Sequence, residues 1–212
     1  MYGTEREFKD LAVYIAVQKG FADGYGWKGN VPDVCLCLSH KTRIDVNNLL
    51  NEQVARDKEA KGQQTWQLRA PEHLPAVTMQ PQDYRIWVGA ELIGCTRGDQ
   101  AKVLHAVTYV VEEVTGGEGE LLVRLRMSTE FRNSESVSSD TDSQEGSEQL
   151  LLSGDDVARL MRPTHCLVYY TSQGRTLRDK QVLLLDVTNH HFTLRHFIVG
   201  VSRATSGKLL SI

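Results

Sequence analysis

Several features that would place this chain in a common class are missing. No apolar run approaches the roughly 20 residues that a membrane-spanning helix needs. The opening MYGTEREFKD lacks a basic stretch followed by an apolar core, so we expect no secretory signal and an intracellular protein, with nuclear, viral and mobile-element settings all open. The four cysteines include no C-x-x-C pair, and no histidines have zinc-finger spacing, so we expect no metal site.

The composition is ordinary for a soluble globular protein, but the charge is unevenly distributed along the chain. Formal net charge is −3, but the segment 133–149 contains five acidic residues and neither lysine nor arginine. From Val157 to Ile212 the chain has eight basic and two acidic residues. A locally basic module suits polyphosphate or nucleic-acid partners, although a solvated basic face would give the same count.

The N-terminal third predicts a helix, a loop and then a strand–helix unit. Thr4-x-x-Glu7 is a capping-box pattern before helical apolar spacing, Gly20 ends that helix, and FADGYGWKGN is a Gly-rich loop, which gives a lead-in over 1–30. VCLCLS at 34–39 predicts an apolar strand in which Cys35 and Cys37 share one face as small buried thiols. A helix capped near Ser39 should follow, with an inward stripe of Val46, Leu49, Leu50 and Val54.

The middle of the chain changes from connection to β pattern. Residues 57–85 are polar and contain three of the five prolines, so we expect them to be a connection. IWVGAELIG, VLHAVTYVVEEV and ELLVRLRM then predict three strands of a small inserted β module. Trp87 is expected to be a core aromatic residue. The serine-rich acidic segment 133–149 cannot support a core and is interpreted as a loop.

The C-terminal part predicts a helix followed by a strand–turn–strand–helix–strand order. Ser153 should cap the short helix SGDDVARLM, after which HCLVYY, VLLLDV and KLLSI are the expected strands. TSQGRTL at 171–177 is the turn, and TLRHFIVGVSRAT is the helix before the last strand. In the turn, Gly174 permits a backbone angle that lets main-chain N–H groups and the Thr176 hydroxyl approach phosphate oxygens.

The chain contains four segments in this order: LCLSHKTRIDVNNLLN, WVGAELIG, YYTSQGRTL and IVGVSRATSG. In these segments it resembles superfamily-one DNA helicases of the Pif/RecD-like branch, and also the helicase part of transposon and viral replication proteins. The likeness covers roughly 34–212. It implies an α/β fold: a RecA-like second motor domain of the P-loop NTPase type over 31–60 and 150–212, with an SH3-like β module inserted over 61–132 and the loop 133–149 between them.

The resemblance also implies roles for single residues. In the segment similar to helicase motif IV, His40 stands where the family often has Asn, and Asn47 matches the second polar position. YYTSQGRTL is similar to motif V, in which Gln173, Gly174 and Thr176 match. The remaining expected nucleic-acid contacts in this turn are Tyr170, Thr171, Ser172 and Arg175, where Tyr170 and Thr171 replace the usual His and Lys. Arg175 would supply a cation, and Tyr170 would stack on a base.

IVGVSRATSG is similar to motif VI and gives Arg203 the arginine-finger position. A planar, permanently charged guanidinium suits the charge that develops on a γ-phosphate. Gln173, Gly174 and Arg203 would then face the nucleotide. Ser202 and Thr205 are expected to fix the arginine. A plain glycine turn and a surface arginine are the alternative interpretations of these two motifs taken singly.

The sequence contains no G-x-x-x-x-G-K-[ST] phosphate loop and no acidic Walker B pair. ATP and Mg²⁺ are therefore expected only together with an N-terminal RecA-like domain, in a longer protein or in trans. The expectation is the C-terminal portion of an ATP-dependent DNA helicase that acts on single-stranded or forked DNA and is inactive by itself. The alternatives are a non-catalytic nucleic-acid-binding remnant and an unrelated interaction domain.

Overall fold

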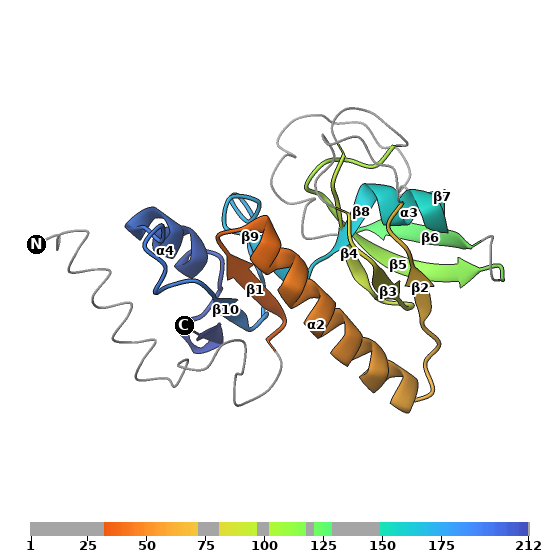
Figure 1. Cartoon of the computed structure of the whole chain (residues 1–212), viewed down its shortest axis with the longest axis horizontal. Coiled ribbons are helices and arrows are strands. Elements are labelled where there is room, and N and C mark those ends of the chain that lie inside the picture. Colours follow the sequence, from red (N-terminus) through yellow and green to blue (C-terminus); the bar gives the residue numbers. More distant parts are fainter. Residues whose placement is uncertain (1–31, 72–80, 97–101, 118–120, 129–148, 212) are drawn as a thin grey trace, which may run out of the picture. The chain divides into compact units, whose positions relative to one another are not determined.

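The computed structural model describes residues 32–71, 81–96, 102–117, 121–128 and 149–211 (Figure 1). The predicted N-terminal helix and Gly-rich loop lie outside these residues, as does nearly all of the acidic segment 133–149. The chain divides into two compact units. Unit 1 contains Met1–Leu50 and His165–Ile212, and unit 2 contains Asn51–Thr164.

Unit 1 is built on a four-stranded parallel sheet in the order β11-β10-β1-β9. The strands are β1 (Val34–Cys37), β9 (Cys166–Val168), β10 (Val182–Leu184) and β11 (Leu210–Ser211). The helices are α2 (His40–Ala60), which begins in this unit, α4 (Leu194–Val201) and the short 3-10 helix Gly207–Leu209. This arrangement confirms the predicted strand–helix unit and the predicted C-terminal order.

The centre of unit 1 is small and rich in thiols. All four residues of β1 are buried, as expected for a central strand of a parallel sheet. Cys35, Cys37 and Cys166 pack with Val46 and Leu50 of α2. The cysteines are free thiols, and burial raises the pKa of Cys35, so it stays a neutral, apolar side chain. The predicted structural role of the first two cysteines is confirmed.

Unit 2 is antiparallel. Its five-stranded sheet has the order β7-β6-β5-β4-β8, and a separate hairpin pairs β2 (Trp66–Leu68) with β3 (Tyr84–Ile86). The five strands are β4 (Glu91–Gly94), β5 (Thr108–Thr115), β6 (Leu122–Met127), β7 (Gln149–Ser153) and β8 (Met161–Pro163). The helix α3 (Gly154–Leu160) lies between β7 and β8, and Ser153 caps it as predicted.

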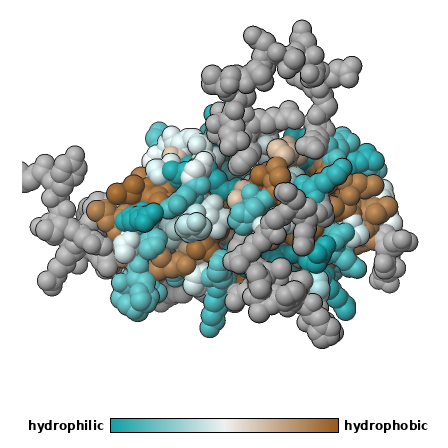
Figure 2. All heavy atoms as spheres, turned by 90° about the horizontal axis from the view of Figure 1, so that it is seen from above, coloured by the Kyte–Doolittle hydropathy of each residue, from teal (hydrophilic) through white to brown (hydrophobic). Residues whose placement is uncertain are grey.

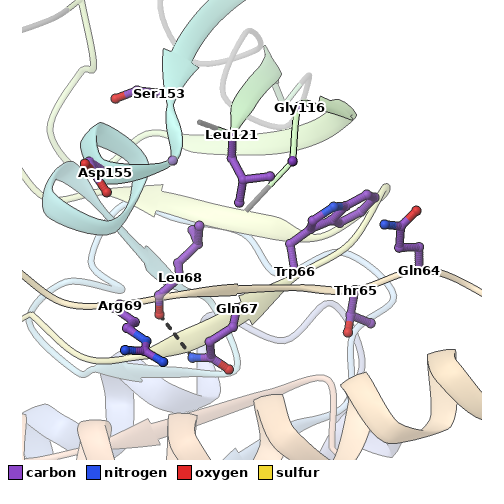
Figure 3. A pocket seen from close by; sticks show the side chains of 12 residues that line it. Gln64, Thr65, Trp66, Gln67, Leu68, Arg69, Gly116, Leu121, Ser153 and Asp155 are labelled. Carbon is purple, nitrogen blue, oxygen red and sulfur yellow. Dashed lines mark hydrogen bonds between the residues drawn. The ribbon is translucent and has the colours of Figure 1, made fainter. Parts of the chain in front are cut away.

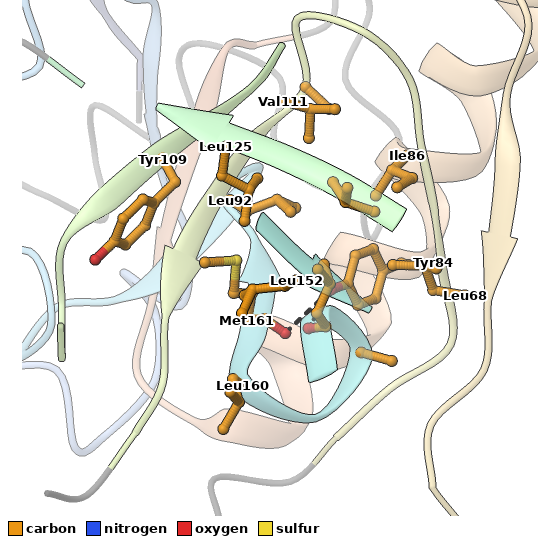
Figure 4. Packing of buried hydrophobic residues seen from close by; sticks show 14 of the residues in the cluster. Leu68, Tyr84, Ile86, Leu92, Tyr109, Val111, Leu125, Leu152, Leu160 and Met161 are labelled. Carbon is orange, nitrogen blue, oxygen red and sulfur yellow. Dashed lines mark hydrogen bonds between the residues drawn. The ribbon is translucent and has the colours of Figure 1, made fainter. Parts of the chain in front are cut away.

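The core of unit 2 contains alternate residues of β5 and β6, packed with side chains from other strands (Figure 4). Tyr109 and Val111 of β5 and Val123 and Leu125 of β6 are at most 2% exposed. Trp87 is buried, as predicted. The Tyr84 hydroxyl reaches across this core and donates to the Val157 carbonyl at 2.9 Å.

Several sequence-based boundaries were wrong. Residues 57–85 are not only a connection, because α2 continues to Ala60 and this segment also contains β2 and the start of β3. The predicted strand 86–94 is broken by a turn at Gly89, which has φ +92°. Residues 150–164, assigned to the motor domain from sequence, contain most of β7 and all of β8 of the antiparallel sheet.

The inward stripe of α2 also differs from the prediction. Leu49 is 48% exposed, whereas Asn47 and Asn51 are buried. The Asn51 amide donates to the Arg85 carbonyl at 2.9 Å and accepts from the Arg85 N–H at 2.7 Å. An asparagine can be buried on a helix when its side chain is hydrogen-bonded to the main chain of a strand, so burial on α2 does not follow the apolar pattern alone.

Among the described residues, no helix is long and apolar enough to cross a membrane. Figure 2 shows hydrophobic residues on one face of the molecule as separate patches between polar ones. Exposed large hydrophobic residues include Leu151, Tyr170 and Ile198.

Candidate functional site

Two consecutive tyrosines follow β9 and have opposite environments. Tyr169 is 1% exposed, its hydroxyl donates to the Leu185 carbonyl at 3.0 Å, and its ring lies edge-on to Phe192 with centroids 5.6 Å apart. Burial, and then the carboxylate of Asp186, raise the pKa of Tyr169 well above its usual value. Tyr170 is 79% exposed. The buried Tyr169 next to it fixes the main chain, and the Tyr170 ring faces solvent.

The 171–176 turn leaves some main-chain donors unused. The Arg175 N–H donates to the Ser172 carbonyl at 3.2 Å, and Gly174 has φ +78°, which confirms the predicted left-handed glycine. Within the described part of the chain, the N–H groups of Gly174 and Thr176 and the Thr176 hydroxyl have no hydrogen-bond partner, and both residues are exposed. These are the groups expected to approach phosphate oxygens.

Arg203 lies just beyond the end of α4 rather than inside a helix, because α4 ends at Val201. Its guanidinium reaches the 171–176 turn, where Nη1 donates to the Arg175 carbonyl at 2.6 Å. Nε donates to the Val199 carbonyl at 3.1 Å, and Nη2 donates to the Ser202 hydroxyl at 2.9 Å. A guanidinium has five N–H groups, so these bonds leave part of its donor capacity for a ligand.

The main chains of the two segments also lie side by side. The Leu177 N–H donates to the Arg203 carbonyl at 2.8 Å, and Leu177 forms a parallel bridge with Ala204. The Thr205 hydroxyl accepts from the Asp179 N–H at 3.3 Å, instead of contacting the arginine. The structure therefore brings the two C-terminal motifs together through both main chain and side chain.

Two expected nucleic-acid contacts are buried. Asn47 is 0% exposed, donating to the Cys166 carbonyl at 3.1 Å and accepting from the Cys166 N–H at 2.8 Å. Ser172 is also 0% exposed, and its hydroxyl donates to the Tyr169 carbonyl at 2.8 Å. In this structure both side chains join parts of the protein to each other and are inaccessible to a ligand.

The remaining expected residues differ in how open they are. Gln173 is exposed, and so is His40 at the start of α2, where the Ser39 hydroxyl caps the helix by accepting from the Thr42 N–H at 3.0 Å. Partial burial, and then nearby Arg43, lower the pKa of His40. The Arg175 Nε donates to the Thr171 carbonyl at 3.2 Å, so this guanidinium folds back onto its own turn.

Sequence reasoning missed Asp186, which lies two residues beyond the end of β10. Its carboxylate accepts from the Leu38 N–H at 2.8 Å, so it joins the carboxyl ends of two neighbouring parallel strands. Its φ is +61°, a conformation that aspartate tolerates better than most residues. The only signal in the sequence was an aspartate directly after the apolar run VLLL.

A second missed feature is the start of α4. The His196 Nδ1 accepts from the Thr193 N–H at 3.1 Å and lies 3.0 Å from the Thr193 hydroxyl. Burial, and then nearby Arg195, lower the pKa of His196, which favours the neutral ring that this bond needs. Thr193-x-x-His196 resembles a capping box with histidine in the place of glutamate.

No protein-family model matches the chain, and no curated protein matches it. Its fold is similar to solved Pif1 helicases. One comes from work on DNA unwinding at forked double-stranded DNA by two coordinating Pif1 helicases, with a TM-score of 0.50, 12% identity, and coverage of 98% of this chain and 43% of that one.

Two further matches have lower scores. Pif1 helicase from Candida albicans gives a TM-score of 0.46 and 16% identity over 95% of this chain and 49% of that one. Pif1 helicase from Bacteroides in complex with ADP-AlF3 and single-stranded DNA gives a TM-score of 0.44 and 13% identity over 98% of this chain and 45% of that one.

The comparison confirms the expected resemblance at the level of fold. A parallel α/β sheet together with an antiparallel sheet matches part of a Pif1 helicase structure, and the chain spans less than half the length of that protein.

Proposed function

We propose that this chain contributes the second motor domain of a Pif-type, ATP-dependent DNA helicase, with Arg203 as its arginine finger and the 171–176 turn as a contact to single-stranded DNA. A phosphate-loop RecA-like domain would come from the rest of a longer protein or from a partner. Unit 2 would then be the inserted β module of SH3-like type. The observation that carries the proposal is the 2.6 Å bond from Arg203 Nη1 to the Arg175 carbonyl, which joins the two motifs.

The donors around this bond fit an anionic ligand. The N–H groups of Gly174 and Thr176 and the unused part of the Arg203 guanidinium are all hydrogen-bond donors on two adjoining segments. Donors fixed before the ligand arrives suit phosphate oxygens. If Arg203 holds the charge that develops during phosphoryl transfer, its removal should cost roughly 10³-fold or more in turnover.

The same donors do not hold magnesium by themselves. Among the described residues, no group of three or more His, Cys, Asp or Glu side chains could hold a metal ion. Mg²⁺ would therefore be bound by the phosphate-loop domain and by ATP. In this division of roles the chain supplies hydrogen-bond donors and positive charge.

The DNA contact should depend on Tyr170 rather than on a cation. Tyr170 is 79% exposed, whereas the Arg175 guanidinium is turned back onto Thr171. An exposed ring can stack on a base of any sequence for about 1–3 kcal/mol. Gln173, exposed in the same turn, would add a polar contact.

The test is to fuse or mix the chain with a phosphate-loop RecA domain of a Pif-type helicase and to measure ATP hydrolysis with and without single-stranded DNA. DNA-stimulated turnover that disappears in Arg203→Ala supports the proposal. Full turnover in that variant would remove Arg203 from the role of arginine finger.

Two further variants separate charge from structure. Arg203→Gln keeps a donor for the Arg175 carbonyl but removes the charge, so it should keep DNA binding and lose turnover. Arg195→Ala removes an exposed arginine from α4 and should leave turnover unchanged.

A binding module without turnover is the second candidate function. It is favoured by the exposure of Tyr170 and by the three hydrogen bonds that hold Arg203 inside its own unit. Salt-sensitive binding of single-stranded DNA without ATP hydrolysis in the fused protein would select this candidate.

A further inference from the structure

Unit 2 contains a pocket of about 890 Å³ (Figure 3), whose lining shares no residue with the candidate site of unit 1. One wall is formed by the consecutive residues 64–69, which include all of β2. The other walls are Gly116, Gly117 and Leu121 of the β5–β6 hairpin and Ser153–Asp155 at the start of α3. Six consecutive residues along one wall indicate a groove beside a strand.

The hydrogen bonds of β3 show which main-chain groups of β2 point away from β3. In the hairpin, Gln67 is opposite Arg85, and both main-chain groups of Arg85 bond to the Asn51 side chain. Arg85 therefore directs these groups away from β2, which makes 67/85 a non-hydrogen-bonded pair. The N–H and C=O of Gln67 must then point away from β3. In the described part of the chain, β2 has no strand on that side.

The side chains around the groove are mixed in character. Trp66 and Leu121 are partly buried against the core of unit 2, so each offers an apolar surface at the groove (Figure 3). Arg69 and Asp155 bring one charge of each sign. Gly117 keeps the opposite wall open, since a Cβ added there would meet nothing within 4 Å.

We propose that this groove binds an extended peptide segment of a partner protein, which pairs with the free edge of β2 as an added strand. The N–H and C=O of Gln67 would bond to the peptide main chain. An apolar peptide side chain would pack on Trp66 and Leu121, while Arg69 and Asp155 would favour a peptide with both charge signs. An unpaired strand edge beside a pocket for alternate side chains is the arrangement that strand addition uses.

The charge of the groove favours peptide over nucleic acid. A nucleic-acid groove needs excess positive charge for its phosphates, but here Arg69 is balanced by Asp155. Alternating main-chain donors and acceptors complement another polypeptide. The proposal concerns unit 2 alone and does not depend on the function proposed for unit 1.

The experiment selects binders from a phage library of random linear peptides on the immobilised full-length chain, after depletion on the Gln67→Pro variant. Proline removes the N–H on the free edge, and an edge strand tolerates proline when that N–H is not paired within the sheet. Selected peptides should be synthesised and should bind the wild-type chain, with roughly tenfold weaker binding to Gln67→Pro. Gln67→Ala keeps the N–H and should bind like wild type.

Gly117→Phe is a second variant, which fills the groove and leaves the sequence of β2 unchanged, and it should also lose peptide binding. Circular dichroism checks that each variant is folded. If Gln67→Pro does not fold, the loss of peptide binding in Gly117→Phe tests the proposal instead. The proposal is overturned if no peptide is enriched, if a selected peptide binds wild type and Gly117→Phe equally, or if oligothymidylate displaces the peptides from the groove.

Discussion

The two units of this protein are held together in different ways. Unit 2 has an eight-residue strand and a core of aliphatic and aromatic side chains. Unit 1 has strands of two to four residues around a cluster with three cysteines. Short strands form few ladder hydrogen bonds, so single polar side chains complete the main-chain bonding of unit 1.

Asn47 and Asp186 are those side chains in unit 1. Each is bonded to the main chain of another segment, Asn47 to Cys166 and Asp186 to Leu38. Unit 2 has buried polar residues too: Asn51 bonds to both main-chain groups of Arg85, and Arg162 is 0% exposed, with its Nη1 donating to the Ala158 carbonyl at 2.9 Å. There Arg162 closes the end of a helix beside a large apolar core. The comparison predicts that apolar truncation damages unit 2 most, and loss of a polar contact damages unit 1 most.

The largest effect is expected from Leu125→Ala in unit 2. Leu125 is 0% exposed, so its truncation should lower the free energy of unfolding by roughly 2–5 kcal/mol. Urea unfolding followed by tryptophan fluorescence reports this unit, because Trp66 and Trp87 both belong to it. Trp27→Phe removes the third tryptophan from the signal. Leu122→Ala, on an exposed position of the same strand, is the control and should change little.

Asn47→Leu in unit 1 comes next. It leaves the N–H and C=O of Cys166 without their partner, at about 1–3 kcal/mol for each group that stays buried and unpaired. The far-UV circular dichroism transition should move to lower urea while the tryptophan transition stays in place. Asp45→Leu, on the exposed side of α2, should move neither. A shift of both transitions in Asn47→Leu would mean that the units unfold together.

The smallest effect is a pH dependence at the start of α4. Neutral His196 accepts the Thr193 N–H, and the pKa of His196 is lowered in the folded chain. The unfolded chain therefore takes up the proton first as pH falls, so this contribution is complete above pH ~6.5 and is lost below it. Urea unfolding between neutral and mildly acidic pH should show a shallower decline in His196→Gln than in the wild type. Equal slopes in the two proteins would exclude His196 as the source.

Features controlled by neighbouring residues could be predicted from the sequence. Ser39 and Ser153 cap their helices, and Gly174 has a positive φ, because each depends on a few adjacent positions. The β pattern of VLHAVTYVVEEV and ELLVRLRM likewise predicted the strands β5 and β6.

Features controlled by distant partners could not be predicted. Asn47 is buried because it bonds to Cys166, 119 residues away, and no local pattern shows that. β2 escaped notice because its three residues pair with a strand on the far side of a proline-containing stretch. At the candidate site, the resemblance identified Arg203 and the turn, but not the hydrogen bond that joins them.

That hydrogen bond makes the Arg175 carbonyl of the turn and an incoming anion compete for the same guanidinium donors of Arg203. Nη1 is 2.6 Å from the Arg175 carbonyl, so an anion that draws the guanidinium outward must weaken its hold on the turn. Relaxation of the turn would in turn free the guanidinium. The position of the Arg203 side chain would then depend both on an anion bound to its guanidinium and on a ligand bound to the turn.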